Sequence, residues 1–241
     1  MKKIILIILA LSIGVNYLTV SAQETDAIKS DSLNSLMKKI AIPESKQNWI
    51  KFKDDIKVNP LTIFIDYKAE FNLSDNDAMI LYKTTKDDLG FTHFQYQQYY
   101  KNIIVSGGTY NVHSNKKGIT FAANGKILTE IYINVLPILN EKQIIDKTLK
   151  YVNAKEYMWQ SDFWEKDLKV RTGKADTTFF PTPQLVIREI KNKNIKFNMR
   201  NSKYFLAFQL DIYSSSPNYS QRIFIDANNG DILETIPLQS N

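Results

Sequence analysis

The chain has 241 residues, of which 44% are hydrophobic and 12% aromatic, so it can bury a sizeable core and is not a disordered protein. It contains no cysteine, which excludes disulfide bracing and lipid attachment at a cysteine. Its formal net charge of +6 is a mild excess, which falls to +4 if the two lysines of the predicted signal peptide are removed.

Residues 1–22 have the pattern of a secretory signal peptide. Lys2 and Lys3 precede an apolar run, and small residues follow up to Ala22. We expect Sec-type export, cleavage between Ala22 and Gln23, and a mature protein that is secreted or kept in the periplasm or cell envelope. An uncleaved membrane anchor is the alternative, but polar residues interrupt the apolar run and a fitting cleavage site follows it.

Residues 23–58 are expected to form a helical lead-in. Apolar residues recur at near-helical spacing from Asp26 to Ile42, and Pro43 stops the pattern. A second helix is predicted to begin at Asn59-Pro60, where a capping side chain precedes a proline with preset φ, and to end near Asn72.

From Ala78 the hydrophobic pattern changes to a period of two residues and predicts an antiparallel meander. Gly107-Gly108 suggests a bulge inside the third strand. We expect strands at 79–84, 91–100, 103–113 and 119–123. We expect turns at Lys101-Asn102, Lys116-Lys117-Gly118 and Asn124-Gly125.

After Pro137 the order of helix and then sheet returns. Asn140 and Gln143 fit a capping-box-like helix start, and an aromatic connector from Tyr157 to Trp164 leads into a looser stretch that ends at Pro183. The fold class is therefore expected to be α+β, with two consecutive modules that each pack a helix on an antiparallel sheet. The predicted strands of the second module are 184–190, 204–213, 221–227 and 231–236.

Both histidines of the chain, His93 and His113, are predicted to lie on polar strand faces. Alternation places Gln95 and Gln97 on the face of His93, and Asn111 on the face of His113. The two histidines are twenty positions apart, with no H-E-x-x-H motif and no nearby carboxylate, so we expect no metal site. A surface or interface role is the preferred interpretation.

Other candidate sites also favour a noncatalytic protein. Ser106 lacks the G-x-S-x-G elbow, and no thiol or glycine-rich phosphate loop is present. The segment 226–231 has Gly and Asp in the wrong places for a calcium loop, and the preferred interpretation is a hairpin turn. We therefore expect no cofactor.

The densest positive charge lies between Lys191 and Lys203, where basic residues alternate with aromatic ones. Such a segment has the residue types of a nucleic-acid site, but export argues against a nucleic-acid partner, and we expect none. A solvated loop and strand edge, or a surface that docks an acidic protein, is the preferred interpretation.

Three segments of the predicted meander form a recognisable set: Leu89–Tyr100, Ile104–Gly108 and Val112-His113. On these segments residues 60–128 resemble the fungalysin/thermolysin propeptide (FTP) domain of secreted zinc metallopeptidases. The turn Lys101-Asn102 departs from the Asn-Gly that is common in the family. Residues 139–236 resemble the companion PepSY-type region. The matching segments are 185–187, 205–208 and 225–233.

This resemblance implies a cystatin-like or PepSY-like fold, with an FTP-like domain at 59–136 and a PepSY-like domain at 137–241. It implies a pro-region that assists the folding of a thermolysin-like peptidase domain, holds it inactive, and acts in cis or in trans. The interface candidates are then His93, Gln95, Gln97, Asn111 and His113, with solvated strand positions as the alternative.

The sequence up to Asn241 has no zinc-ligand set, so as written we expect no peptide hydrolysis. One alternative is the N-terminal fragment of a full metallopeptidase precursor. Another is an envelope ligand-binding module that uses an exposed aromatic groove of Tyr157, Trp159 and Trp164.

Overall fold

The structure, a computed structural model, describes residues 37–46, 48–191 and 203–238. The predicted signal segment, with its cleavage site at Ala22 and Gln23, lies outside the described residues, as does most of the basic segment between Lys191 and Lys203. The described strands are β1 (Trp49–Lys51), β2 (Asp77–Lys86), β3 (Thr92–Tyr100), β4 (Ile103–Ser114), β5 (Thr120–Gly125), β6 (Glu156–Tyr157), β7 (Gln184–Glu189), β8 (Tyr204–Ser216), β9 (Asn218–Asp226) and β10 (Ile232–Pro237).

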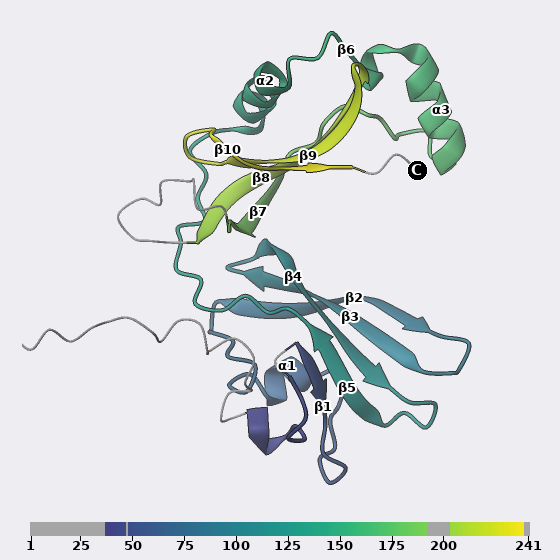
Figure 1. The fold of residues 1–241 in the computed structure, drawn as a ribbon, viewed down its shortest axis with the longest axis vertical. Coiled ribbons are helices and arrows are strands. Elements are labelled where there is room, and N and C mark those ends of the chain that lie inside the picture. Colours follow the sequence, from purple (N-terminus) through teal and green to yellow (C-terminus); the bar gives the residue numbers. More distant parts are fainter. Residues whose placement is uncertain (1–36, 47, 192–202, 239–241) are drawn as a thin grey trace, which may run out of the picture. The chain divides into compact units, whose positions relative to one another are not determined.

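These strands join into one hydrogen-bonded network (Figure 1). Its main path runs β1-β5-β4-β7-β8-β9-β10, while β3 pairs with β4 and β2, and β6 pairs with β8. Among the described strands, the pairing of β4 with β7 is parallel and the others are antiparallel. The described helical segments are η1 (Met37–Lys39), α1 (Ile63–Asp66), α2 (Glu141–Val152), η2 (Met158–Gln160) and α3 (Asp162–Thr172).

The first half of the chain forms the predicted meander. Lys101 and Asn102 both have positive φ, 47° and 66°, as a tight hairpin turn requires, so β3 and β4 are joined as expected. The inner sheet face packs on α1 and the chain around it, with the Phe64 ring centroid 4.8 Å from Tyr96 and 5.8 Å from Tyr110. Burying such rings contributes about 1.5–3 kcal/mol each, so this cluster anchors the meander.

The predicted N-terminal helical lead-in lies largely outside the described residues. Of the helix expected over Asp26–Ile42, the described end is the short 3-10 turn η1, and Trp49–Lys51 is a strand that pairs with β5. Met37 and Ile50 are buried in the same cluster as Phe64. This segment therefore packs as part of the core rather than leading into it.

The helix predicted at Asn59-Pro60 is shorter than expected. The Asn59 side chain accepts a hydrogen bond from the Leu61 backbone N–H at 3.0 Å, which starts a turn, but regular α1 covers only Ile63–Asp66. Phe71 still packs on Phe64, with ring centroids 4.9 Å apart, because turns continue the helical direction.

An excursion in β4 links the two halves of the sheet. The β3–β4 register shifts between Gln97 and Tyr99, and on the opposite strand residues 105–108 have no direct partner in β3. This excursion confirms the predicted bulge at Gly107-Gly108. It turns Ile104–Ser106 toward β7, which pairs with them in parallel.

The hairpin predicted at Asn124-Gly125 is wrong. Both residues lie inside β5, where Asn124 pairs with Asn111 and Gly125 pairs with Tyr110. Gly125 has φ +147°, and a Cβ there would lie 2.3 Å from the backbone oxygen of Thr109. The glycine is needed for this close backbone crossing and not for a turn.

The second half packs α2 against the sheet of β7 to β10 (Figure 1). Asn140 accepts a hydrogen bond from the Gln143 N–H at 2.9 Å, and the Gln143 side chain accepts one from the Asn140 N–H at 3.0 Å. This reciprocal pair confirms the predicted capping box. Ile144 of α2 is fully buried where the helix packs on the sheet.

Helix α3 replaces the looser stretch that was expected after Trp164. None of its residues is buried, and Phe163 and Val170 are 69% and 74% exposed. An exposed helix leaves no apolar stripe in the sequence, so periodicity could not reveal it. Gly173, in the left-handed conformation, ends the helix.

The structure confirms an α+β fold with a large, mostly antiparallel sheet. The division into two separate modules stays a prediction, because β4 and β7 place the strands in one network and Tyr100, Val105 and Leu128 share a core cluster with Ile144. None of the described helices has the length and apolar character needed to cross a bilayer.

Candidate docking surface

The register of β3 and β4 brings the predicted site residues together. His93 lies directly opposite His113, and Gln95 lies directly opposite Asn111. Directly opposed residues of an antiparallel pair project from the same sheet face, so these four side chains form one patch. Across the next pairings, Asn124 and Trp49 continue the Gln95–Asn111 row. We call these six residues the outer face.

The two histidines of the outer face are in direct contact. Their Nδ1 atoms are 2.7 Å apart, and the rings meet edge to face with centroids 5.0 Å apart. Each ring also uses its other nitrogen: His93 Nε2 is 3.0 Å from Asp87 Oδ2, and His113 Nε2 is 2.5 Å from Asn124 Oδ1. The pair is therefore held at both outer ends.

The carboxylate of Asp87 corrects the expectation that no carboxylate lies near the histidines. Asp87 lies in the turn between β2 and β3, and its Oδ1 atom also accepts the backbone N–H groups of Leu89 and Phe91. The hydrogen bond from His93 and then that from the Phe91 backbone lower the pKa of Asp87 below its ordinary value. Strand alternation could not predict that Asp87 lies beside His93, because alternation assigns no sheet face to a residue in a turn.

Gln97, the fifth predicted interface residue, is committed to the fold instead. Its side-chain nitrogen donates to the backbone oxygens of Gln98, Val105 and Gly108, at 3.0, 2.8 and 3.0 Å. These bonds connect the Gln97 side chain on β3 to the backbone of the β4 excursion. A partner could contact the edge of this side chain, but its donor groups are already used.

Aromatic rings lie within and beside the outer face. Trp49 stacks on His113 with centroids 6.0 Å apart and planes 25° apart, and Phe121 lies 6.4 Å from the same ring. Phe91 packs edge to face on Phe121 at 5.7 Å. Trp49 is 47% exposed and Phe121 39% exposed, so polar and aromatic groups reach solvent together. Such a mixture is typical of protein-binding surfaces.

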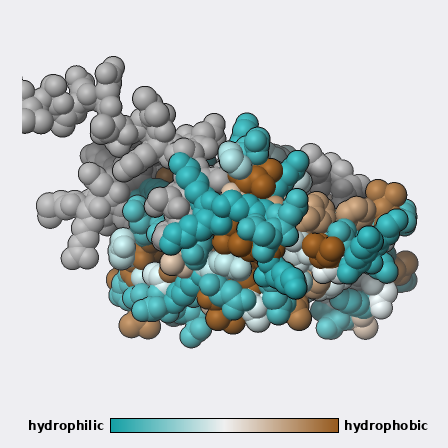
Figure 2. Space-filling model, turned by 90° about the horizontal axis from the view of Figure 1, so that it is seen from below, coloured by the Kyte–Doolittle hydropathy of each residue, from teal (hydrophilic) through white to brown (hydrophobic). Residues whose placement is uncertain are grey.

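The end of the molecule that carries α1 and β1 in Figure 1 is seen face-on in Figure 2. Over its described surface, hydrophobic and hydrophilic residues are interspersed and form no single continuous hydrophobic area. Recognition through this end of the molecule would therefore combine polar and apolar contacts.

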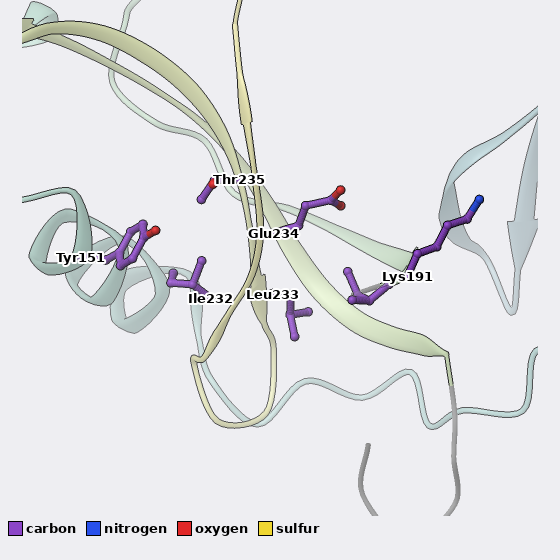
Figure 3. A pocket seen from close by; sticks show the side chains of 7 residues that line it. Tyr151, Lys191, Ile232, Leu233, Glu234 and Thr235 are labelled. Atoms are coloured by element: carbon purple, nitrogen blue, oxygen red, sulfur yellow. The ribbon is translucent and has the colours of Figure 1, made fainter. Parts of the chain in front are cut away.

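A shallow hollow of about 350 Å³ lies between the end of α2 and β10 (Figure 3). Tyr151 comes from α2, and Ile232–Thr235 comes from β10. Two charged side chains, Lys191 and Glu234, line its described wall, and Glu234 accepts a hydrogen bond from Arg188 Nε at 2.8 Å. Among the described residues no group of three or more His, Asp or Glu side chains is arranged to hold a metal ion, in this hollow or elsewhere.

The aromatic groove considered for a ligand-binding module is not formed by the described residues. Tyr157 is buried in the core, and Trp159 stacks on it with centroids 4.4 Å apart and planes 15° apart. Trp164 packs instead on Phe163 of α3. Tyr157 and Trp159 therefore pack η2 on the core, and Trp164 lies apart from them on α3.

The comparison with protein families decides which class of domain the meander belongs to. Residues 77–127 match the sequence model of the Fungalysin/Thermolysin Propeptide Motif. This FTP motif covers β2 to β5, which carry most of the outer face. The FTP resemblance is thus confirmed for this segment, and a propeptide of a fungalysin/thermolysin-type peptidase is the class of protein it indicates.

The other comparisons add little. No curated protein gives a significant match to the chain. Among solved structures, the chain is similar to the Bacillus megaterium YpeB C-terminal domain at 14% identity and a TM-score of 0.35, over 80% of this chain and 72% of that chain. A likeness of this size carries no argument, so the resemblance of residues 139–236 to a PepSY-type region stays a prediction.

Proposed function

We propose that the chain is a noncatalytic pro-region of the FTP type that binds the catalytic domain of a thermolysin-like zinc metallopeptidase, in cis or in trans. Bound in this way it assists the folding of the catalytic domain and keeps it inactive, in the secreted or envelope compartment. The observation that carries the proposal is the FTP motif over residues 77–127.

The outer face supplies the docking surface in this proposal. Gln95 and Asn111 lie side by side on β3 and β4. Neither side chain forms a hydrogen bond with another described residue. Their amide groups are therefore available to a partner backbone, while Trp49 and Phe121 beside them add exposed ring surface. Gln97 contributes shape only, since its amide is bonded internally.

The experiment mixes residues 23–241 with the catalytic domain of a thermolysin-like peptidase secreted by the same organism. We expect saturable inhibition of peptide hydrolysis and a higher refolding yield of the denatured catalytic domain. Absence of both effects, with folded protein and an active peptidase, would contradict the proposal.

A matched pair of variants locates the surface. Asn111→Arg places bulk and charge at the centre of the outer face, and we expect it to weaken inhibition by about tenfold or more, equivalent to about 1.4 kcal/mol. Asn218→Arg makes the same change at an exposed position of β9 and should leave inhibition unchanged. Equal inhibition by both variants would show that docking uses another surface.

A further inference from the structure

The hydrogen bonds at the outer ends of the histidine pair fix which nitrogen of each ring carries a proton. The Asp87 carboxylate oxygens are acceptors, and Oδ2 lies 3.0 Å from the Nε2 of His93, so this Nε2 donates. At the other end Asn124 has its amide oxygen toward His113, and with the amide in this orientation the Nε2 of His113 donates as well. In this arrangement both Nε2 atoms hold a hydrogen.

The two Nδ1 atoms are left facing each other. When each neutral ring carries its proton on Nε2, both Nδ1 atoms present a lone pair, and at 2.7 Å two lone pairs repel. The contact is favourable only when a positive ion lies between the two nitrogens. That ion can be a proton or a metal cation.

We propose that the His93–His113 pair is a binding site for a divalent transition-metal ion of the kind that prefers imidazole nitrogen, such as Zn²⁺ or Cu²⁺. The ion would lie between the two Nδ1 atoms. Zinc–nitrogen bonds of about 2.0–2.1 Å at a tetrahedral angle place the nitrogens about 3.3 Å apart, so the rings need to separate by only about 0.6 Å.

Two features of the surroundings suit this role. Metal-bound histidines characteristically donate their other N–H to a carboxylate or an amide oxygen, which fixes ring orientation, and Asp87 and Asn124 accept in this way here. The His93 side chain is 29% exposed, so an ion can enter from solvent, while the Trp49 ring stacked on His113 limits its rotation.

The site has two protein ligands, and water completes the coordination shell. No third His, Asp or Glu among the described residues is placed to bind the same ion. The sequence argument against a metal rested on the number of ligands, the missing H-E-x-x-H motif, the separation of the histidines and the lack of a nearby carboxylate; the fold removes the last two, and the site proposed here has two protein ligands only. This inference is independent of the proposed peptidase binding, because its test contains no peptidase.

The test titrates untagged residues 23–241 with Zn²⁺ by calorimetry and with Cu²⁺ by electron paramagnetic resonance. We expect one ion per chain and, for Cu²⁺, hyperfine coupling to two imidazole nitrogens. The chain has only two histidines, so His93→Gln and His113→Gln should each abolish this signal. Asp87→Asn should weaken Zn²⁺ binding by about tenfold to a hundredfold, because Asp87 orients a ligand without touching the metal.

A measurement on the metal-free wild type keeps the proposal open to refutation even if a variant misfolds. Long-range ¹H–¹⁵N NMR reports which ring nitrogen carries the hydrogen, and we expect Nε2–H on both rings. A His113 ring with hydrogen on Nδ1 would make the contact an ordinary neutral hydrogen bond and would overturn the proposal. Unchanged Zn²⁺ and Cu²⁺ binding by the double variant His93→Gln/His113→Gln would do the same.

Discussion

The side chain of Gln98 pairs with the backbone of Leu128 as a neighbouring strand would. Its Nε2 donates to the Leu128 oxygen at 2.7 Å, and its Oε1 accepts from the Leu128 N–H at 2.9 Å. Gln98 is fully buried, and its Nε2 also donates to Asp77 Oδ1 at 2.9 Å. Leu128 lies in the segment between β5 and α2, and the Gln98 amide gives its backbone the two hydrogen bonds that a neighbouring strand would give.

Gln98→Met should destabilise the protein by about 2–4 kcal/mol, because it keeps the side-chain size but leaves the buried N–H and C=O groups of Leu128 without their partner. Chemical denaturation followed by circular dichroism measures the free energy of unfolding. Gln95→Met, on the outer face of the same strand, is the control and should change it by less than about 0.5 kcal/mol. Equal effects would mean that the Gln98 pairing contributes nothing specific.

Tyr110→Phe should leave stability unchanged or raise it by about 1 kcal/mol. The Tyr110 hydroxyl is buried and has no hydrogen-bond partner among the described residues, and burial raises the pKa of Tyr110 strongly. The matched variant is Tyr96→Phe, which removes a hydroxyl that donates to the backbone oxygen of Pro60 and should cost about 1 kcal/mol. Thermal unfolding of the two variants side by side tests the contrast, and a reversed order would refute it.

Gly125→Ala should be more harmful than Gly118→Ala. Both glycines have positive φ, but the space around Gly118 is open, so alanine there meets only the backbone strain of about 1–2 kcal/mol. At Gly125 the added Cβ would also lie 2.3 Å from the Thr109 oxygen, which forces β4 and β5 apart. We expect a loss at least twice as large in the free energy of unfolding; similar losses would argue against the close crossing.

Glu189 gives the protein an acid-sensitive contact. Burial raises the pKa of Glu189, but hydrogen bonds from Lys126 and then Lys203 outweigh it and lower the pKa overall. A lowered pKa in the folded state adds stability above the ordinary carboxyl range, and this stability is lost as pH falls through the folded value.

Between about pH 5 and pH 3, the stability advantage of the wild type over Glu189→Gln should therefore shrink. Urea denaturation midpoints at a series of pH values measure this difference. A constant difference across the series would show that the contact with Lys126 and Lys203 does not hold the carboxylate.

Sequence patterns predicted the strands well because the decisive signals are local. Alternation marks the buried face of β3, and the turns require left-handed residues that only a few residue types supply, as at Asn102 and Gly118. Patterns failed where the structure depends on distant contacts. Alternation alone puts Gln98 on the buried face with Tyr96 and Tyr100, but its pairing with Leu128 depends on a segment thirty residues away in the chain.

The contact between the histidines shows the same limit. Counting back from the turn, where Tyr100 pairs with Ile103, an uninterrupted hairpin would place His93 opposite Tyr110. The excursion shifts the register by three residues, so His93 meets His113 instead. The sequence indicated a bulge at Gly107-Gly108 but not how many residues it would take up, and therefore could not predict this contact.

The junction of β4 and β7 has a consequence for how the molecule would respond to proteolysis. The connector after β5 exposes Tyr132 and Leu136, 80% and 72% accessible, as targets for a protease. A cut there would leave the two pieces joined by the parallel pairing of Ile104–Ser106 with β7 and by a core to which both contribute. One cleavage would then yield a nicked but assembled protein, and its disassembly would require a second, separate event.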